Sequence, residues 1–238
     1  MPKNFWPAGA GVELFRVKRR TIFITGTDTG VGKTVLACLL TRHCRARGIS
    51  VGAFKPVCSG GRDDAEALHT ALDGELALDE INPWHFRALV TPLLAARAEK
   101  KAVKLAQVLA KARRLQERFP ILIVEGAGGL LSPLGEDFDS RDLITALRAT
   151  PVVVSPNRLG AINQVLLTLA ALPRGVSQSA PVVLVTPPQP NAAGRGNLKF
   201  LREQLGPQRV HELPQVKLPE PGKSAGKVLA ALTTWLGL

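Results

Sequence analysis

The sequence contains no tyrosine, and aromatic residues make up only 5% of its 238 residues. Proteins that hold single-stranded nucleic acids stack the bases on aromatic side chains, so few platforms for such binding exist here. The net charge of +12 would otherwise favour a nucleic-acid partner. However, the densest basic stretch, residues 97–118, has apolar residues at helical spacing, so most of its basic residues belong to the solvated side of a helix. We therefore expect no nucleic-acid partner.

Long apolar runs are also missing. No apolar stretch approaches the about 20 residues that a membrane-spanning helix needs, so we expect no membrane partner. Residues 1–20 carry their basic cluster at the end, whereas a secretory signal places positive charge ahead of a long apolar stretch. We interpret residues 1–20 as a disordered N-terminal extension, or as residues that precede the true start codon. We expect a cytoplasmic protein.

Cysteine is scarce. The three cysteines are odd in number and lack the spacing of metal ligands, which argues against a disulfide framework and a zinc site. We expect reduced thiols, as in cytosolic proteins. Cys38 and Cys44 fall in a predicted helix and are expected to be packing residues.

Strand-like apolar runs alternate with helical patterns along most of the chain. The strands are predicted at 21–25, 51–54, 121–124, 152–155, 182–186 and 209–213. The helices are predicted near 33–47, 64–72, 102–118, 140–148, 161–172, 195–205 and 223–236. Several strands are continuous Val/Ile/Leu runs, which is typical of parallel strands covered on both faces. The sequence thus predicts an α/β fold in which residues 21–238 form a single domain, a doubly wound, mostly parallel sheet flanked by helices.

A short strand, a loop of small residues and the start of a helix follow one another at 21–35. Gly32, Lys33 and Thr34 open the helix, and backbone N–H groups at such a position bind phosphate. Lys33 would reach the terminal phosphates, and the Thr34 hydroxyl would bind magnesium. In the usual spacing a glycine stands where this chain has Thr27. We interpret the segment as a nucleotide-binding loop.

Charged residues stand at three further places, near the ends of two predicted strands and at the start of a predicted helix. Lys55 follows the strand at 51–54 and could stabilise developing negative charge, or it could be an ordinary lysine before a turn proline. Asp63 or Asp64 could bind magnesium, or could simply favour a helix start. Glu125 closes four consecutive apolar residues, which indicates a functional acid on the metal or on a metal-bound water.

A glycine also follows the strand at 152–155. Gly160 lets the backbone approach another group closely, and the helix that begins near Ala161 offers N–H groups to an anion. By itself this segment is a weak indication, because many strand-to-helix turns contain a glycine.

Together these segments resemble the ATP-dependent dethiobiotin synthetase family, which has the P-loop NTPase fold. The resemblance covers roughly residues 21–165. Its matching segments are Gly26 to Thr34, Lys55 to Gly60, Asp64-Ala65, Asn82 to Phe86, Glu125 to Gly129 and Leu159 to Asn163.

The resemblance implies a ligase that forms C–N bonds in biotin biosynthesis. Its substrates would be 7,8-diaminononanoate, CO2 and ATP, with Mg2+ as cofactor. One amine would capture CO2 as a carbamate, ATP would phosphorylate the carbamate, and the second amine would close the ureido ring. The family forms homodimers with the site at the interface, so a homodimer is expected.

The resemblance also implies roles for individual residues. The implied catalytic residues are Lys55, Lys33 and Thr29. The implied metal ligands are Thr34, Asp64 and Glu125. The implied substrate-binding residues are Thr29, Lys55, Ser59, Gly160, Ala161, Ile162 and Asn163, the last four acting on the substrate carboxylate from the neighbouring subunit. The implied nucleotide-binding residues are Gly30, Val31, Gly32, Lys33, Thr34, Val35, Asp64, Glu125, Gly126, Ala127, Gly128, Thr186, Pro214, Gln215 and Val216.

Some positions depart from the family pattern. The asparagine that usually follows the strand at 182–186 and reads adenine is replaced by Thr186. A hydroxyl cannot present a donor and an acceptor together as an amide does, so we expect relaxed nucleotide choice. Gly30, the segment Thr91-Pro92-Leu93 and Gln164 also depart, but none of these changes removes a phosphate or carbamate contact.

Other functions of the same fold group fit the sequence less well. The cobyrinate and cobyrate amidation enzymes carry a glutaminase domain, for which this sequence has no room. An ATPase switch of the partitioning type has a second lysine early in the phosphate loop, where this chain reads Thr27-Asp28-Thr29. A nucleotide-binding relic without catalysis is disfavoured by Lys33, Thr34, Lys55 and Glu125.

Overall fold

A six-stranded, fully parallel sheet organises the chain. The computed structural model describes residues 19–189, 192–216, 218 and 223–238. The strand order is β2-β5-β1-β6-β7-β8. The strands are β1 (Arg20–Gly26), β2 (Val51–Phe54), β5 (Ile121–Glu125), β6 (Thr150–Pro156), β7 (Val182–Thr186) and β8 (Val210–Pro214). Ligands bind such sheets at the carboxyl ends of the strands, where the strand order reverses.

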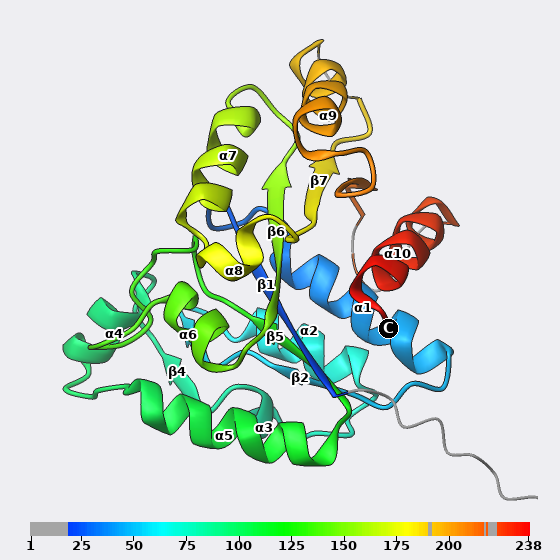
Figure 1. Ribbon diagram of the computed structural model, residues 1–238. Coiled ribbons are helices and arrows are strands. Elements are labelled where there is room, and N and C mark those ends of the chain that lie inside the picture. Colours follow the sequence, from blue (N-terminus) through cyan, green and yellow to red (C-terminus); the bar gives the residue numbers. More distant parts are fainter. Residues whose placement is uncertain (1–18, 190–191, 217, 219–222) are drawn as a thin grey trace, which may run out of the picture.

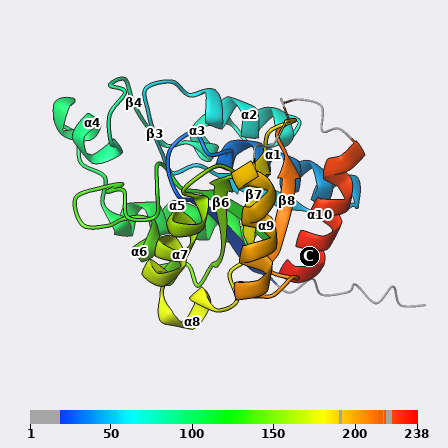
Figure 2. The ribbon, with the colours of Figure 1, turned by 90° about the horizontal axis from the view of Figure 1, so that it is seen from above.

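Helices cover both faces of this sheet (Figure 1). One layer holds α1 (Lys33–Ala46), α2 (Asp63–Ala71) and α10 (Lys223–Leu236). The other holds α5 (Leu105–Arg118), α6 (Ser140–Ala146), α7 (Ala161–Ala171), α8 (Arg174–Ser177) and α9 (Ala192–Leu205). Figure 2 shows α1, α2 and α10 on one side of the sheet and α6, α7 and α9 on the other. The expected doubly wound fold is confirmed.

A smaller unit lies beside β2. It contains the parallel pair β3 (Val57–Ser59) and β4 (Trp84–Phe86), together with α3 (Leu78–Ile81) and α4 (Pro92–Ala98). The sequence reasoning missed these elements and also α8. Strands of three residues and helices of four to seven residues are too short to show a clear hydrophobic period.

The central strands are buried on both faces, as their uninterrupted apolar sequences predict. Every residue from Ile121 to Glu125 is buried, as are the residues of β2. The inner side of α1 contributes Leu36, Leu40 and both of its cysteines to the same core. All three cysteines are free and buried, so Cys38 and Cys44 are packing residues, as expected.

The observed element boundaries differ from the predicted ones by up to three residues, and two of these differences have a clear physical reason. Arg20 already pairs with Ile121, so the folded domain includes a residue that was assigned to the N-terminal extension. Residues 1–18 lie outside the described residues. The helix predicted from 102 begins at Leu105, because Lys104 is extended and its N–H donates to the Gln107 side chain.

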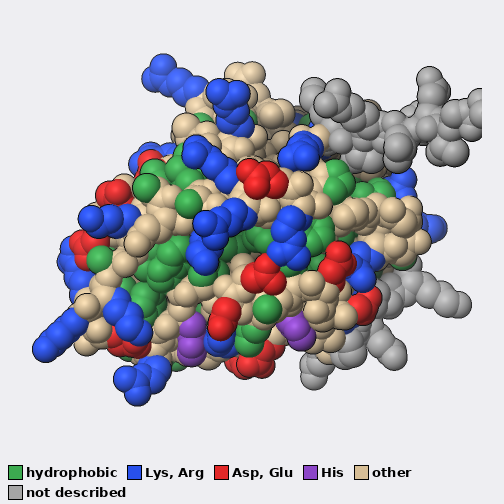
Figure 3. All heavy atoms as spheres, turned by 90° about the horizontal axis from the view of Figure 1, so that it is seen from below, with side chains coloured by type: hydrophobic (Ala, Val, Ile, Leu, Met, Phe, Trp, Pro, Cys, Tyr) green, Lys and Arg blue, Asp and Glu red, His purple; other side chains and the backbone are tan. Residues whose placement is uncertain are grey.

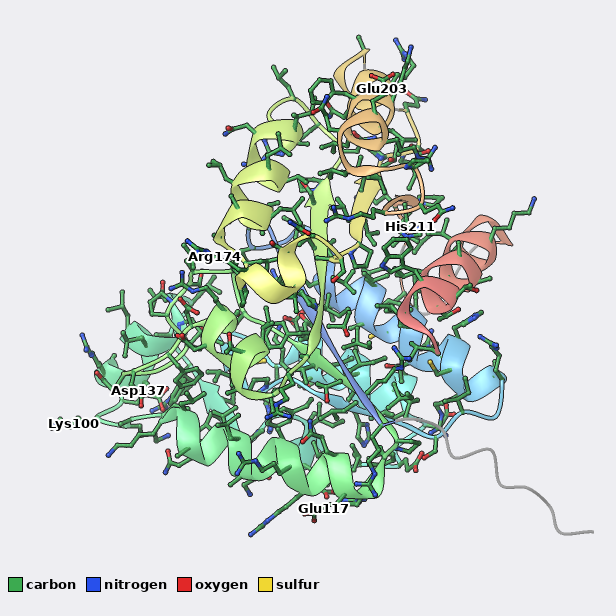
Figure 4. All side chains as sticks on the ribbon, viewed as in Figure 1. Lys100, Glu117, Asp137, Arg174, Glu203 and His211 are labelled. Carbon is green, nitrogen blue, oxygen red and sulfur yellow. The ribbon has the colours of Figure 1, made fainter. Side chains whose placement is uncertain are left out.

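Basic residues are spread over the surface. Figure 3, which faces the side that carries α5, shows Lys and Arg side chains interspersed with Asp and Glu. Charged residues also lie at opposite ends of the molecule, with Glu203 on α9 at the top and Glu117 on α5 at the bottom (Figure 4). Within the described residues, no helix combines the length and apolarity that membrane crossing requires.

Candidate active site

The loop between β1 and α1 has the backbone that phosphate binding requires. Gly30 and Gly32 have φ values of 69° and 101°, a region that favours glycine. A Cβ atom at Gly32 would lie 3.1 Å from a methyl of Val185, so a side chain would also be crowded there. The Gly32 carbonyl accepts the first helical bond, from the N–H of Leu36. The N–H groups of the first helical turn therefore have no carbonyl partner within the helix. This arrangement is a cradle for an anion at a helix start.

Lys33 is held inside this loop. Its ammonium donates to the carbonyl of Asp28 at 2.7 Å, and the residue is only 6% exposed. Burial, and then the positive charge of Lys55, lower the pKa of Lys33 to about 8. A bound phosphate would favour the charged form, because an opposite charge offsets both effects.

Lys55 is the centre of a buried ionic cluster. It follows β2 directly and is 2% exposed. Its ammonium lies 2.5 Å from Glu125 Oε1 and 2.8 Å from Asp64 Oδ2, and it also donates to the Gly126 carbonyl at 3.2 Å. The interpretation of Lys55 as an ordinary surface lysine is therefore wrong.

Thr34 joins the same cluster. Its hydroxyl lies 2.7 Å from Asp64 Oδ1 and 2.8 Å from Glu125 Oε1. Of the two acids considered at the start of α2, it is thus Asp64 that turns toward the nucleotide-binding loop.

The oxygen atoms of this cluster fit a magnesium ion. Glu125 Oε2 is buried and has no hydrogen-bond partner. Magnesium prefers oxygen ligands and is usually held by one or two carboxylates together with waters and phosphates. The described residues contain no group of three or more His, Cys, Asp and Glu side chains that could hold a metal. Thr34, Asp64 and Glu125 could supply the protein ligands.

The carboxylates and the ammonium shift one another's pKa. Burial alone would lower the pKa of Lys55, but Glu125 and Asp64 outweigh it and raise that pKa above its usual value. Burial tends to raise the pKa of Asp64, but the charge and hydrogen bond of Lys55, together with Thr34 and Lys33, outweigh it and lower that pKa. For Glu125, burial is the stronger effect and raises the pKa, although Lys55 opposes it. The ammonium of Lys55 is therefore a fixed charge at neutral pH.

These residues line one cavity of about 750 Å³. The predicted residues on its wall are Thr29, Gly30, Gly32, Lys33, Thr34, Val35, Lys55, Ser59, Asp64, Glu125, Ala127 and Gly128. Val31 and Gly126 do not line it: Val31 is buried beside the loop, and Gly126 contributes its carbonyl to Lys55.

Sequence reasoning assigned no site role to several other residues of the wall. These are Cys58, Gly61, Leu89, Val90, Thr91, Pro92 and Ser132. Leu89 and Val90 are 85% and 47% exposed, so one part of the wall presents apolar groups to solvent. Neither shows periodicity, since both lie in the irregular segment between β4 and α4. Burial raises the pKa of the Cys58 thiol to about 12, so this side chain is a neutral wall group.

The residues expected at the base lie away from this cavity, at the ends of β7 and β8. Thr186 pairs with Pro214, and the N–H of Gln215 donates to the Thr186 carbonyl at 2.7 Å. The buried Thr186 hydroxyl accepts from Asn157 Nδ2 at 3.0 Å and donates to Glu212 at 2.8 Å. It is thus already bonded within the protein.

The segment Gly160–Asn163 is also outside the cavity. Gly160 has φ 88° and precedes α7, with no atom within 4 Å of where its Cβ would be. The neighbouring Leu159 is 79% exposed. Within one chain, therefore, the structure unites the phosphate loop with Lys55, Asp64 and Glu125 but not with this segment.

Known proteins are similar to this chain in sequence and in fold. A family model described as an AAA domain matches residues 20–221. The ATP-dependent dethiobiotin synthetase BioD of Methanococcus vannielii is 40% identical over 148 residues, which are 62% of this chain and 70% of that protein. The protein of the same name from Anaeromyxobacter dehalogenans strain 2CP-C is 44% identical over 169 residues, 69% of this chain and 76% of that protein.

A likeness to solved structures concerns the fold alone. A ParA family ATPase from Chlorobium tepidum TLS matches with a TM-score of 0.50 and 10% identity, over 93% of this chain and 92% of that one. Such low identity gives no support to a partitioning function. The two synthetases, by contrast, match at high identity over most of their own length. The chain therefore belongs, among AAA-domain proteins, to the ATP-dependent dethiobiotin synthetase family.

Proposed function

We propose that this protein is an ATP-dependent cyclo-ligase that makes dethiobiotin from 7,8-diaminononanoate and CO2. One observation carries the proposal: the cradle that ends at Lys33 and the buried ammonium of Lys55 open into the same cavity. A phosphate acceptor placed there would meet both groups. The assignment agrees with the names of the related synthetases.

The phosphate loop would hold the triphosphate of ATP. Backbone N–H groups before α1 and the Lys33 ammonium would bind its oxygens, and Thr34, Asp64 and Glu125 would hold Mg2+. When bound, the metal neutralises charge on the phosphate oxygens. Lys55 releases no proton in this scheme, because its neighbouring carboxylates keep it charged.

Lys55 and its neighbours would organise the carbon chemistry. The first amine attacks CO2 and loses a proton to give a carbamate, whose negative oxygen would face Lys55. That oxygen attacks the terminal phosphorus and ADP leaves, which forms a carbamic–phosphoric anhydride. The second amine attacks the carbonyl carbon, loses a proton and expels phosphate as the ring closes. Thr29 and Ser59, both on the cavity wall, would hold the diamine or the carbamate.

The cavity wall also suits an aliphatic diamine. The ionic cluster lies at one part of the wall, and Leu89, Val90 and Pro92 supply apolar surface at another. The substrate has the same division between two amines and a run of methylene groups. Burying the methylene groups of the diamine against these side chains would stabilise the complex of enzyme, ATP and diamine. The complex with ATP alone lacks this contribution.

A homodimer would complete the substrate site. Gly160, Ala161, Ile162 and Asn163 lie outside the cavity of their own chain, so they would receive the substrate carboxylate of a partner. Leu159 and Leu167 are 79% and 61% exposed, and apolar side chains of this size commonly become buried at subunit interfaces. The proposal includes a cytoplasmic enzyme with small-molecule substrates, without nucleic-acid or membrane partners.

The first prediction concerns coupling of the two substrates. ATP should release phosphate only when both the diamine and bicarbonate are present, because the carbamate is the phosphate acceptor. Labelled bicarbonate should enter dethiobiotin in the same amount as phosphate is released. ATP turnover at equal rate without the diamine would contradict the ligase and favour an ATPase switch.

The second prediction concerns Lys55. Replacing it by alanine should lower the rate of ring closure by at least ~10²-fold, the scale for removing one charge-stabilising group. Binding of ATP should change little, because the loop and Lys33 remain. Lys111→Ala, at an exposed lysine of α5, is the matched control and should retain full activity. Near-normal turnover of the folded Lys55→Ala variant would exclude the assigned role.

The third prediction concerns the base of the nucleotide. With Thr186 bonded to Asn157 and Glu212, no free amide stands at that position. A bidentate contact contributes about 1–3 kcal/mol of discrimination between bases, so its loss should let CTP or GTP replace ATP appreciably. Side-by-side rates with the three nucleotides measure this. A strong preference for ATP would mean that another residue reads the base.

The fourth prediction concerns the homodimer. Leu167→Asp should place a charge in the interface and convert the dimer to a monomer. Sedimentation should then show half the molecular mass, and the rate of dethiobiotin formation should fall. Ala231→Asp, at an exposed position of α10 in the opposite helix layer, introduces the same charge and should leave the dimer intact. A monomeric wild-type protein with full activity would contradict the shared site.

A further inference from the structure

Lys55 is fixed through its backbone as well as through its ammonium. It lies between β2 and Pro56, outside the hydrogen-bonded ladder of either sheet. Its N–H donates to the Ile81 carbonyl at 2.8 Å, and its carbonyl accepts from Asn82 Nδ2 at 2.8 Å. Both backbone groups of Lys55 are therefore satisfied by the two residues at the end of α3.

Asn82 is a buried bridge. The residue is 1% exposed, and both the nitrogen and the oxygen of its side-chain amide form hydrogen bonds. Nδ2 donates to the carbonyls of Lys55 and, at 3.2 Å, Trp84, while Oδ1 accepts from Arg62 Nε at 3.2 Å. An amide is required for this pattern, because it alone offers donors and an acceptor in one plane.

Arg62 connects this bridge to the helix that carries the metal ligand. It stands directly before α2, two residues before Asp64. Its guanidinium donates to the Asn82 carbonyl at 2.7 Å, besides the bond to the Asn82 side chain. A third bond, to Asp79 at 2.8 Å, reaches an acid whose side chain is 86% exposed.

These contacts form a closed ring. It runs from the Lys55 carbonyl to Asn82, then to Arg62, along the chain to Asp64, and from the Asp64 carboxylate back to the Lys55 ammonium. The elements it joins, β2, α2 and α3, pack against one another, and Figure 2 shows α2 and α3 as neighbours. Holding the lysine at both its backbone and its ammonium restricts where its charge can lie.

We propose that Asn82, held by Arg62, is a positioning residue. It fixes the Lys55 ammonium and the Asp64 carboxylate in the relative positions that transfer of the phosphoryl group requires. The inference rests on the proposed function. Asn82 touches neither the cavity nor a substrate; it acts through the lysine. A displacement of about 1 Å in a catalytic group can reduce the rate by about 10²-fold, so the bridge affects the chemical step more than binding.

The decisive variant is Asn82→Asp, which preserves size and the acceptor for Arg62 but replaces the donor to the Lys55 carbonyl. Asn82→Ala removes both functions, and Arg62→Ala leaves the bond from Asn82 to Lys55. Asp79→Ala is the matched control, since it removes one exposed contact of Arg62 and leaves the ring closed.

We expect Asn82→Asp and Asn82→Ala to lower kcat by about 10²-fold while KM for ATP stays within a few-fold of the wild-type value. Arg62→Ala should cause a smaller loss, and Asp79→Ala should behave as wild type. Binding of a non-hydrolysable ATP analogue, followed by calorimetry, should be preserved in every variant. Thermal melting must show that each variant is folded at the assay temperature.

Two results would overturn the inference. The first is a folded Asn82→Asp variant with the kcat of Asp79→Ala. The second is loss of the folded state in both Asn82 variants, or equal losses of nucleotide binding and kcat, since either would indicate a merely structural role. The wild-type protein is assayed first with labelled bicarbonate. If it makes no product, the proposed function fails; if it is active and the Asn82 variants are too, only this inference fails.

Discussion

The ammonium of Lys55 is the one charge on which the site depends. Two carboxylates, a buried one from the end of β5 and a half-exposed one from the start of α2, approach each other around it. Without a cation they would repel each other, and Glu125 is buried deeply enough for burial to raise its pKa. A buried ion pair of this kind contributes little net stability, but removing one partner costs about 3–5 kcal/mol. Net stability therefore does not explain the cluster, which agrees with the functional role that we propose for it.

The topology explains why these groups meet. β2, β5 and β1 are adjacent in the sheet and parallel, so their carboxyl ends lie at one edge. Lys55 follows β2, Glu125 ends β5, and the phosphate loop follows β1. Three segments that are far apart in sequence thus deliver a cation, an acid and an anion cradle to one cavity. The segment between β2 and β5, which contains β3, α2, α3 and β4, contributes Asp64 to the site and Asn82 to the bridge.

The sequence predicts the parts of the site that depend on local pattern. Continuous apolar runs before Gly26 and Glu125 indicate buried strands, and the structure confirms that both strands are buried. Lys55 was ambiguous because nothing local distinguishes a buried lysine from an exposed one. Its partners lie 9 and 70 residues away, and only the sheet order brings them together.

The parts that the sequence could not give depend on contacts between irregular segments. Leu89 and Val90 form part of the wall without any periodic pattern, and the pair β3 and β4 is too short to show one. Likewise, only the structure shows that Thr186 is already bonded to Asn157 and Glu212. Hydrogen bonds between distant side chains leave no signal in a single sequence.

The most direct test of the account is a structure of the protein with a non-hydrolysable ATP analogue, Mg2+ and the diamine. The account predicts the terminal phosphate between the ammonium groups of Lys33 and Lys55, each within about 3 Å of a phosphate or carbamate oxygen. The diamine should lie beside Leu89 and Val90. A complex in which the phosphates occupy the loop while Lys55 contacts neither the phosphate nor the diamine would contradict it.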